Sequence, residues 1–227
     1  MGLKRKSDAD VHKPHENLTG SNGVSDADNS LPPSGQGLKQ ALRSLVETLD
    51  ASSVRYAIIG GIATIQHGRV RTTADIDVLL TIPQIAMPAL FSALLEKGFT
   101  LDLKRNIAEL RENGLTTLRF QDVLVDMMRP ILPVYSHVLD RAISADILGK
   151  SVRISTVEGL IVMKLIAFRP QDEADIQELI SAYRGQLDMD YVRSEFATVA
   201  NTDDPRWRKL EAWLNPPNPQ HPPNPQP

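Results

Sequence analysis

The sequence has 227 residues, of which 41% are hydrophobic and 23% are charged, a composition typical of a folded globular protein. Its formal net charge of −3 argues against a broad basic surface for nonspecific nucleic-acid binding, while a local basic patch remains compatible with it. The absence of cysteine excludes disulfides, thiolate zinc sites and cysteine nucleophiles, and no apolar stretch is long enough to span a membrane, so we expect a cytoplasmic protein.

Both ends of the sequence have the composition of tails. Residues 1–36 are polar and rich in Gly, Ser, Asn and Asp, so they bury too little apolar surface to offset their ordering entropy and are predicted to be disordered. Residues 215–227 are rich in proline and favour an extended polyproline II conformation. We interpret this second tail as a spacer, and docking into an aromatic-lined groove of a partner is the alternative.

The first half of the region between the tails alternates between helix and strand patterns. Apolar residues from Leu38 to Leu49 recur at helical spacing, and Gly98 is a common kind of helix stop. The predicted elements are, in order, a helix over 38–49, a strand over 54–59, a turn or short helix over 62–68, a strand over 74–81 and a helix over 83–97.

The second half begins with short extended segments and ends with helices. Asn113-Gly114 predicts a hairpin turn, and the antiparallel return after one helix indicates a mixed sheet. The predicted elements are extended segments at 99–104, 107–111, 115–120 and 123–128, a helix over 134–148, a strand over 151–154, helices over 160–168 and 172–183, and two further helical segments to 214. The predicted fold class is α/β (α+β), with a mixed-sheet core over 37–155 and a helical C-terminal section over 156–214.

Residues 56–81 concentrate side chains suited to a metal and a phosphate. Asp75 and Asp77 lie two residues apart on a predicted strand, so their side chains share a face. Two like charges so close on an apolar strand are costly unless a cation joins them, and paired carboxylates suit Mg²⁺. Gly60 and Gly61, upstream, let a backbone turn approach a phosphate closely. Together these features predict a site for a metal and a nucleotide.

The pattern GG-x-A-x(3)-H-G-x-x-R-x-T-x-D-I-D in this stretch resembles the signature of the DNA polymerase β-like nucleotidyltransferase superfamily. The matching residues are Gly60, Gly61, Ala63, His67, Gly68, Arg71, Thr73, Asp75 and Asp77. The sequence most resembles the AbiEii/AbiGii-type family, which includes toxin components of bacterial toxin–antitoxin pairs. Residues 162–176 look like the C-terminal motif of the same family. One departure is Ile62, where the superfamily often has a serine.

A third carboxylate from a neighbouring strand usually completes a site of this kind. Two metals roughly 3.5–4 Å apart activate the attacking oxygen and stabilise the leaving one. Asp126 is our candidate, because it interrupts the apolar run 123–128, where an unpaired charge is expensive. The resemblance implies that Asp126 completes the metal set and orients or deprotonates the acceptor hydroxyl. A satisfied ion pair is the alternative interpretation, and the rival acid, Asp122, is expected to be exposed near a turn.

Three further residues of the motif have two interpretations each. Arg71 and Thr73 either contact phosphate or brace the loop in which they lie. His67 precedes a glycine, and a lone histidine in that position is more often a packing or capping residue than a ligand, so we interpret it as structural.

The C-terminal motif contributes a lysine and two acids. Lys164 lies on an otherwise apolar helix, where lysine costs free energy unless its ammonium reaches water or an anion. The resemblance implies that Lys164 contacts nucleotide phosphates, and extension into solvent is the alternative. It also implies that Asp172 or Asp175 helps to organise the site or the start of a helix; for Asp172 we favour a helix N-cap.

The resemblance as a whole implies an Mg²⁺-dependent nucleotidyltransferase that moves a nucleoside monophosphate from an NTP to an acceptor hydroxyl. The implied metal-binding and catalytic residues are Asp75, Asp77 and Asp126, and the implied nucleotide-binding residues are Gly60, Gly61, Arg71, Thr73 and Lys164. The AbiEii/AbiGii likeness further implies a toxin that modifies tRNA or another cellular target and is neutralised by an antitoxin protein. The alternatives are transfer to a small molecule such as an antibiotic, and a nucleotide-binding or interaction module without catalysis.

Overall fold

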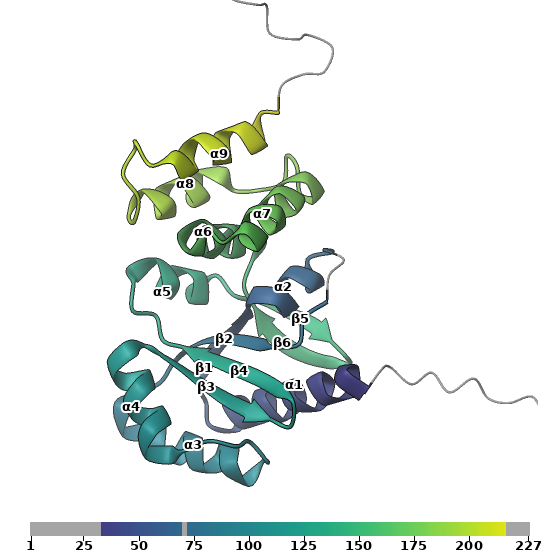
Figure 1. Ribbon diagram of the computed structural model, residues 1–227, viewed down its shortest axis with the longest axis vertical. Helices are drawn as coiled ribbons and strands as arrows, with labels where there is room; N and C mark the ends of the chain where they lie inside the picture. The colour runs from purple at the N-terminus through teal and green to yellow at the C-terminus, as the bar shows by residue number, and fades with distance from the viewer. Residues whose placement is uncertain (1–32, 70–71, 217–227) are drawn as a thin grey trace, which may run out of the picture. The chain divides into compact units, whose positions relative to one another are not determined.

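The computed structural model describes residues 33–69 and 72–216 (Figure 1). The tails predicted at 1–36 and 215–227 therefore lie, apart from a few residues, outside the described part of the chain. The first helix begins at Pro33, before the predicted start at Leu38. Within the described residues, no helix combines the length and the hydropathy needed to cross a membrane.

The elements follow the predicted alternation in the first half of the chain and end in helices. The helices are α1 (Pro33–Ala51), α2 (Gly60–Gln66), the 3-10 turn η1 (Gln84–Ala86), α3 (Met87–Glu96), α4 (Leu103–Asn113), α5 (Pro133–Asp140), α6 (Val157–Ala167), α7 (Pro170–Ala182), α8 (Met189–Ala197) and α9 (Pro205–Leu214). The strands are β1 (Arg55–Ile59), β2 (Ile76–Thr81), β3 (Leu115–Phe120), β4 (Val123–Met128), β5 (Ile143–Ile147) and β6 (Lys150–Ile154).

The strands form one six-stranded sheet in the order β3-β4-β2-β1-β6-β5. Strand β2 runs parallel to β4 and antiparallel to β1, and β1 runs parallel to β6. The two hairpins β3-β4 and β5-β6 lie at the two edges of the sheet. The predicted mixed sheet is thus confirmed, and its parallel pairs β2-β4 and β1-β6 lie at the interior of the sheet.

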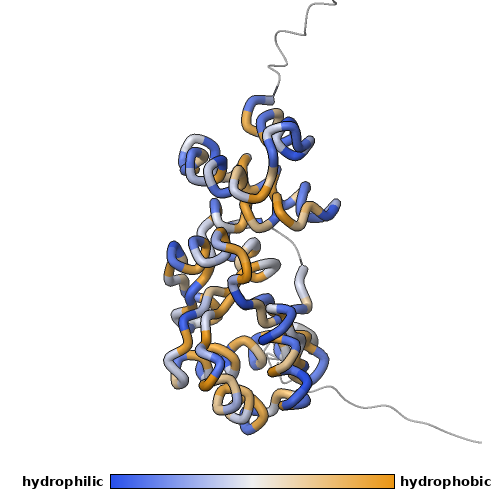
Figure 2. Tube along the Cα trace, turned by 90° about the vertical axis from the view of Figure 1, so that its left-hand side faces the viewer, coloured by the Kyte–Doolittle hydropathy of each residue, from blue (hydrophilic) through white to orange (hydrophobic). Residues whose placement is uncertain are grey.

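Helices cover both faces of this sheet. Helix α1 packs on β1, β4 and α3, and α4 packs on α3 and β3, whereas α2 and α5 contact β1 and β2 and also pack against α6 (Figure 1). The strands bury apolar side chains toward these helices, and Figure 2 shows further hydrophobic segments where the C-terminal helices face one another. Helices α7 and α8 pack on α6, and α9 packs on α7, so the helical section is built outward from α6.

The predicted extended segment at 107–111 is wrong, because these residues belong to α4. Asp102 caps this helix by accepting a hydrogen bond from the Arg105 backbone N–H at 2.8 Å, and Leu110 on its inner face is fully buried. Asn113-Gly114 is not a hairpin turn: Asn113 ends the helix, and Gly114 follows in the left-handed region with φ +73°. Asn-Gly is common both at helix C-termini and in hairpin turns, because each requires a residue with positive φ.

We predict that Gly114→Ala destabilises the protein by about 2–3 kcal/mol. An alanine must adopt the same positive φ, and its Cβ would lie 2.3 Å from Cγ2 of Ile131. Gly149→Ala is the matched control, because Gly149 has φ +77° but open space around the Cβ position. Urea denaturation of both variants separates the backbone strain from the steric contact, and equal losses would show that the contact with Ile131 costs nothing.

The predicted helix over 134–148 is also too long, because the chain forms α5 and then the edge strand β5. Helix α5 ends at Asp140, and residues 143–147 pair with β6 through a turn in which Leu148 and Gly149 both have positive φ. Strand pairing at the sheet edge here outweighs local helix propensity. Helix α6 begins earlier than predicted, at Val157, where the N-cap Thr156 accepts a hydrogen bond from the Gly159 backbone N–H.

Candidate active site

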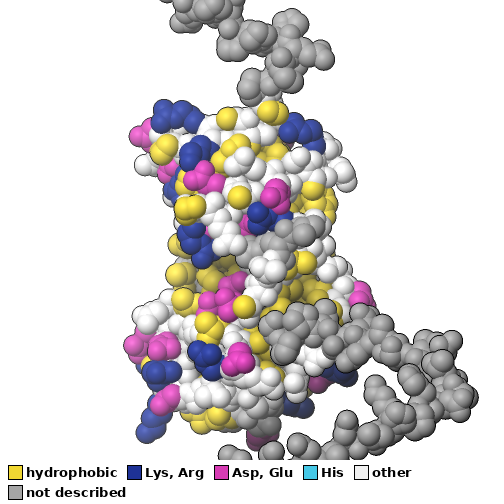
Figure 3. Space-filling model, turned by 45° about the vertical axis from the view of Figure 1, so that its right-hand side comes forward, with side chains coloured by type: hydrophobic (Ala, Val, Ile, Leu, Met, Phe, Trp, Pro, Cys, Tyr) yellow, Lys and Arg dark blue, Asp and Glu magenta, His cyan; other side chains and the backbone are white. Residues whose placement is uncertain are grey.

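The register of the sheet places two predicted site residues side by side. Asp77 on β2 and Asp126 on β4 are direct partners in the parallel pair. Asp75 lies just before β2, two residues from Asp77. All three acids line one cavity of about 440 Å³ between the sheet and the C-terminal helices, and Figure 3 shows acidic and hydrophobic side chains together in this hollow. The three carboxylates predicted from distant parts of the sequence therefore share one site.

Asp77 lies in a partly buried place near two other acids. Burial raises the pKa of Asp77 above its ordinary value, and the nearby negative charges of Asp126 and Asp75 raise it further. A hydrogen bond from the Gly61 backbone N–H and the positive charge of Arg169 oppose this rise without cancelling it. A cation at this position would relieve the repulsion among the carboxylates.

The donor chemistry of the cavity fits Mg²⁺, which prefers oxygen ligands. Among the described residues, no three Asp, Glu or His side chains converge closely enough to form a complete metal site by themselves. Mg²⁺ is usually held by one or two carboxylates, with water and substrate phosphate completing its shell, so this arrangement suits it. Asp126 is held on the sheet face by a hydrogen bond from the Thr117 hydroxyl to its Oδ1, at 2.6 Å.

Gly60 and Gly61 make room for the side chains of the motif. A Cβ at Gly60, where φ is +59°, would lie 2.0 Å from Oδ2 of Asp77, and one at Gly61 would lie 2.5 Å from Oγ1 of Thr73. The Thr73 hydroxyl in turn donates to the Asp75 carbonyl at 3.3 Å. The glycines thus allow Asp77 and Thr73 to pack against the start of α2, and no larger residue fits there without displacing them.

Lys164 does not extend into solvent. Its side chain is only 8% exposed, and its ammonium forms ion pairs with Asp172 at 3.4 Å and with Asp175, both on α7. It also lines the cavity that contains the three acids. The anions that compensate this buried lysine in the structure are therefore carboxylates of the chain itself, and its contact with a nucleotide phosphate stays a prediction.

A family model described as "Nucleotidyltransferase of unknown function (DUF6036)" matches residues 36–215. The chain belongs to this family. The match covers the sheet, the three acids and the C-terminal helices, so the predicted nucleotidyltransferase function is confirmed at the level of the family. The AbiEii/AbiGii type of the resemblance stays a prediction.

Solved structures of low sequence identity resemble this DUF6036 protein, and one of them reaches a TM-score that indicates a shared fold. The solution structure of the antibiotic-resistance factor ANT(2'')-Ia is 19% identical, with a TM-score of 0.50, and the match covers 78% of this chain and 95% of that one. A crystal structure of ANT(2'')-Ia in complex with adenylyl-2''-tobramycin is 15% identical over 72% and 96% of the two chains, with a TM-score of 0.49. An antigenic nucleotidyltransferase-like protein from Paracoccidioides brasiliensis is 16% identical over 78% and 92%, with a TM-score of 0.43. No curated protein matches the sequence.

In this DUF6036 nucleotidyltransferase, the ion pairs of Lys164 are part of a longer series of alternating positive and negative side chains, which we call the charged chain. Asp175, which is fully buried, also accepts a hydrogen bond from Arg69 on the loop after α2. Asp172 accepts hydrogen bonds from the backbone N–H and the side chain of Arg169. The order Arg69, Asp175, Lys164, Asp172, Arg169 thus links the loop of the GG motif to the start of α7.

Asp172 is not the N-cap that we predicted, although it does take part in the cap of α7. Helix α7 begins at Pro170 with Arg169 as its N-cap, and Asp172 is the third helical residue, which reaches back to the Arg169 backbone N–H in a capping box. Burial alone would raise the pKa of Asp172, but the hydrogen bonds from Arg169 outweigh it and hold this pKa below its ordinary value.

Arg169 is a site residue that the sequence did not reveal. Its largely exposed side chain lines the cavity, and its positive charge acts on Asp77. The one available signal was its position within the C-terminal motif, next to a proline that begins a helix. In the structure, Arg169 is a cation at the wall of the cavity that also holds the acids.

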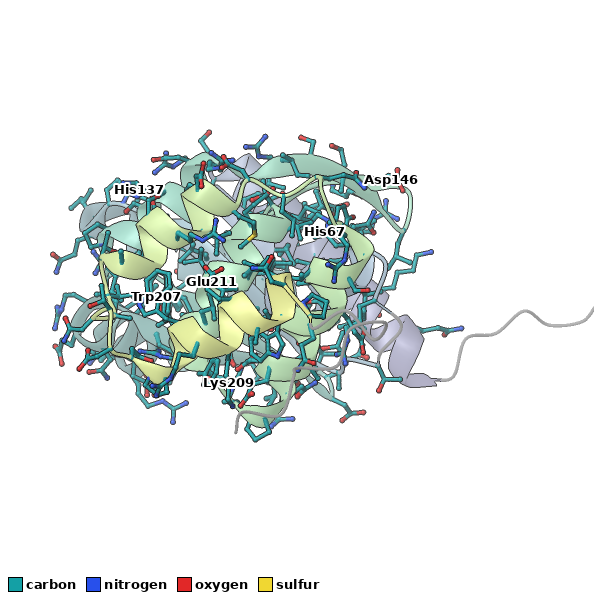
Figure 4. The ribbon with its side chains drawn as sticks, turned by 90° about the horizontal axis from the view of Figure 1, so that it is seen from above. His67, His137, Asp146, Trp207, Lys209 and Glu211 are labelled. Atoms are coloured by element: carbon teal, nitrogen blue, oxygen red, sulfur yellow. The ribbon has the colours of Figure 1, made fainter. Side chains whose placement is uncertain are left out.

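His67 is structural, as predicted. Figure 4 labels His67, whose side chain is buried. Its Nε2 donates to the Ser155 carbonyl at 2.8 Å, and its Nδ1 lies 3.4 Å from the Tyr183 hydroxyl. These contacts join the end of α2 to the start of α6 and to the end of α7.

The two remaining residues of the sequence prediction have different outcomes. Asp122 is exposed in the turn between β3 and β4 and does not line the cavity, in agreement with the prediction. Arg71 lies outside the described residues, so its predicted contact with phosphate stays a prediction.

Proposed function

We propose that this protein transfers a nucleoside monophosphate from an NTP to an acceptor hydroxyl in an Mg²⁺-dependent reaction, with Asp75, Asp77 and Asp126 around the reacting atoms. The observation that carries the proposal is the direct pairing of Asp77 with Asp126 in the sheet, with Asp75 lining the same cavity. The raised pKa of Asp77 supports it, because a group of acids that repel one another suits a divalent cation.

In the proposed reaction, the acceptor oxygen attacks the α-phosphorus, the bond from that phosphorus to the bridging oxygen breaks, and pyrophosphate leaves. Asp126 takes the proton of the acceptor hydroxyl, and Asp75 and Asp77 would bind the cation. When bound, Mg²⁺ supplies charge neutralisation and polarises the phosphate oxygens. The hydrogen bond from Thr117 fixes the orientation of Asp126 for this role.

The triphosphate is proposed to lie along the side of the cavity that is formed by the glycines and the cationic side chains, which we call the polar wall. The residues proposed to contact it are Gly60, Gly61, Arg71, Thr73, Lys164 and Arg169. Support comes from the cations Lys164 and Arg169, which line the cavity, and from the two glycines, which leave the polar wall without Cβ atoms. Lys164 keeps its ion pairs to α7 in this proposal and acts on phosphate as part of the charged chain.

The test is transfer of label from α-labelled NTPs to a panel of acceptors. Wild-type protein is expected to label an acceptor with Mg²⁺, to lose the activity in EDTA and to recover it when Mg²⁺ is restored. Asp126→Asn is expected to lower the rate by about 100-fold or more, because a general base contributes about that much. Asp122→Asn, in the turn that joins β3 to β4 and outside the cavity, is the matched control and should keep full activity. Equal rates for the two variants would contradict the role of Asp126.

The acceptor panel also tests the finer part of the proposal. The likeness of residues 56–81 and 162–176 to the AbiEii/AbiGii-type family supports tRNA as the acceptor and an antitoxin as a partner protein. Total tRNA and a set of antibiotics are therefore offered in parallel reactions. Labelling of tRNA supports the toxin role, and labelling of an antibiotic alone replaces it with transfer to a small molecule.

A further inference from the structure

The two edges of the six-stranded sheet differ in how their backbone groups are paired. At the β3 edge, Arg119 pairs with Thr100, and backbone hydrogen bonds of 2.7 and 3.2 Å run in both directions between them. Helix α4 also packs on β3. At the other edge, β5 pairs with β6, and no further strand of the described residues lies beside it (Figure 1). The β5 edge of the sheet is therefore open to backbone pairing.

The turn of the β5-β6 hairpin sets the hydrogen-bond pattern of β5. Leu148 and Gly149 form this turn, and both have positive φ, as in a two-residue type I′ turn. A turn of this kind closes with a hydrogen bond between the residues on either side of it, which here are Ile147 and Lys150. Ile147 is thus bonded to β6, and the pattern of the remaining strand follows from this position.

Alternate residues of β5 direct their backbone groups to the open edge. Hydrogen-bonded and non-hydrogen-bonded pairs alternate along an antiparallel ladder, so Ala145 and Ile143 bond to β6 as Ile147 does. The N–H and C=O groups of Ser144 and Asp146 then point away from β6. Within the described residues, neither of these two has a backbone hydrogen bond to another part of the chain. Figure 4 shows Asp146 at the rim of the molecule, where these groups are accessible.

The sequence of β5 complements itself in the antiparallel direction. The strand reads Ile-Ser-Ala-Asp-Ile over 143–147, so a two-fold axis at Ala145 places Ile143 opposite Ile147 of a second copy. The same axis places Ser144 opposite Asp146 of the second copy, and these are the residues whose backbone groups point outward. The serine hydroxyl then donates to a carboxylate, and no like charges lie opposite one another along the strand.

Exposed apolar side chains lie at both ends of β5. Ile143 is 43% exposed, and Leu148, directly after the strand, is 52% exposed. Proteins usually protect an open sheet edge with lysine or proline, and β5 contains neither. An unprotected edge with apolar ends indicates a surface that another strand covers.

We propose that this protein forms a two-fold symmetric dimer in which β5 pairs antiparallel with β5 of a second copy, with Ala145 on the axis. The open edge, the outward direction of the Ser144 and Asp146 backbone groups and the self-complementary sequence carry the proposal. A contact of this symmetry closes on itself and makes one continuous sheet from two. Strands β6 and β1 lie between β5 and the acids of β2 and β4, so the candidate active site stays open and the inference does not rest on the proposed function.

The first experiment uses the full-length wild-type protein. Sedimentation velocity over a series of concentrations is combined with amide hydrogen exchange, measured by NMR at the lowest and highest of them. We expect the sedimenting species to change from one chain to two as the concentration rises. We expect exchange of the Ser144 and Asp146 amides to slow by about tenfold or more in the dimer, while that of Ala145, which is already bonded to β6, stays within about twofold.

Two variants test the same contact. Ser144→Pro removes an N–H that points to the open edge, so the monomer keeps its hairpin while the dimer loses a hydrogen bond in each copy. Ile143→Lys places a charge opposite Ile147 of the second copy. We expect each variant to raise the dissociation constant of the dimer by about tenfold or more, because symmetry repeats each loss. Leu95→Lys on α3, at a side chain that is 38% exposed, is the matched control and should dimerise as the wild type does.

Several outcomes would overturn the inference. A wild type that stays monomeric at every concentration contradicts it. A dimer that keeps the fast exchange of Ser144, or that both β5 variants leave intact, has its interface elsewhere. Slow exchange of Ser144 and Asp146 in the monomer would show that part of the same chain covers the edge. An equal loss of the dimer in Leu95→Lys would show that Ile143→Lys acts through added charge alone, and if Ile143→Lys does not fold, Ser144→Pro and the wild-type exchange rates decide.

Discussion

Asp77→Asn is expected to lower the rate of nucleotidyl transfer by about 10³-fold or more and to raise the melting temperature of the metal-free protein. The loss of activity follows because the amide cannot neutralise a cation as the carboxylate does, and several kcal/mol of transition-state stabilisation correspond to that factor. The gain in stability follows because the charge of Asp77 is repelled by Asp126 and Asp75 in a buried place.

The size of the stability change depends on pH. Because the pKa of Asp77 is raised in the folded state, its carboxylate destabilises the fold at neutral pH, and this effect disappears as the pH falls through the raised pKa. The asparagine removes the charge while its amide oxygen still accepts the hydrogen bond from Gly61. Melting curves in EDTA should therefore show the variant above the wild type at neutral pH and close to it in acid.

Magnesium provides the internal control for this prediction. Added Mg²⁺ should raise the melting temperature of the wild type by binding only the folded state, and it should raise that of the variant much less. A variant that melts below the wild type at neutral pH in EDTA would show that the charge of Asp77 is satisfied in the folded protein and would remove one support for the metal site.

Asp175→Asn is expected to lower the free energy of unfolding by about 3 kcal/mol, because it leaves two buried cations with less compensation. The Asp175 side chain is fully buried and pairs with both Lys164, which is 8% exposed, and Arg69, which is 13% exposed. Replacing one member of such a group by a neutral isostere removes the charge balance while keeping the volume.

The control for Asp175 uses a second partner of the same arginine. Glu178 also pairs with Arg69, but its side chain is 55% exposed, so Glu178→Gln should change the free energy of unfolding only slightly. Urea denaturation of both variants measures the difference. Similar losses for the two would show that Arg69 is held from the solvent side and that the buried pair contributes little.

The acids of the site could be predicted because charged residues are unusual in apolar strand segments. Asp75 and Asp77 are spaced by the two-residue period of a strand, and Asp126 is a charge within an apolar run. The sheet then pairs Asp77 with Asp126, while Asp75 lies just before β2. The resemblance implied a third acid on a neighbouring strand, but the order of the strands, which pairs Asp77 with Asp126, comes only from the structure.

The charged chain behind the site could not be predicted, because its partners are distant in sequence. Arg69 and Asp175 are 106 residues apart, and no local pattern marks either as the partner of the other. Lys164 was recognisable as a costly lysine, but the carboxylates that compensate it became visible only in the packing of α7 on α6.

Local ambiguity explains the errors in the fold. Asn113-Gly114 marks a residue with positive φ, and a helix end and a hairpin turn both need one. Residues 143–147 became a strand because an edge of the sheet was available to them, which is a property of the folded chain and not of the segment.

The chain of charges from Arg69 to Arg169 crosses the boundary that we drew between residues 155 and 156. A chimera that joined this sheet to the helices of another nucleotidyltransferase would leave Arg69 facing a foreign surface, and the transplanted helices would lack the counterpart of that arginine. We therefore expect this sheet to accept foreign helices only where they also carry an acid at the position of Asp175.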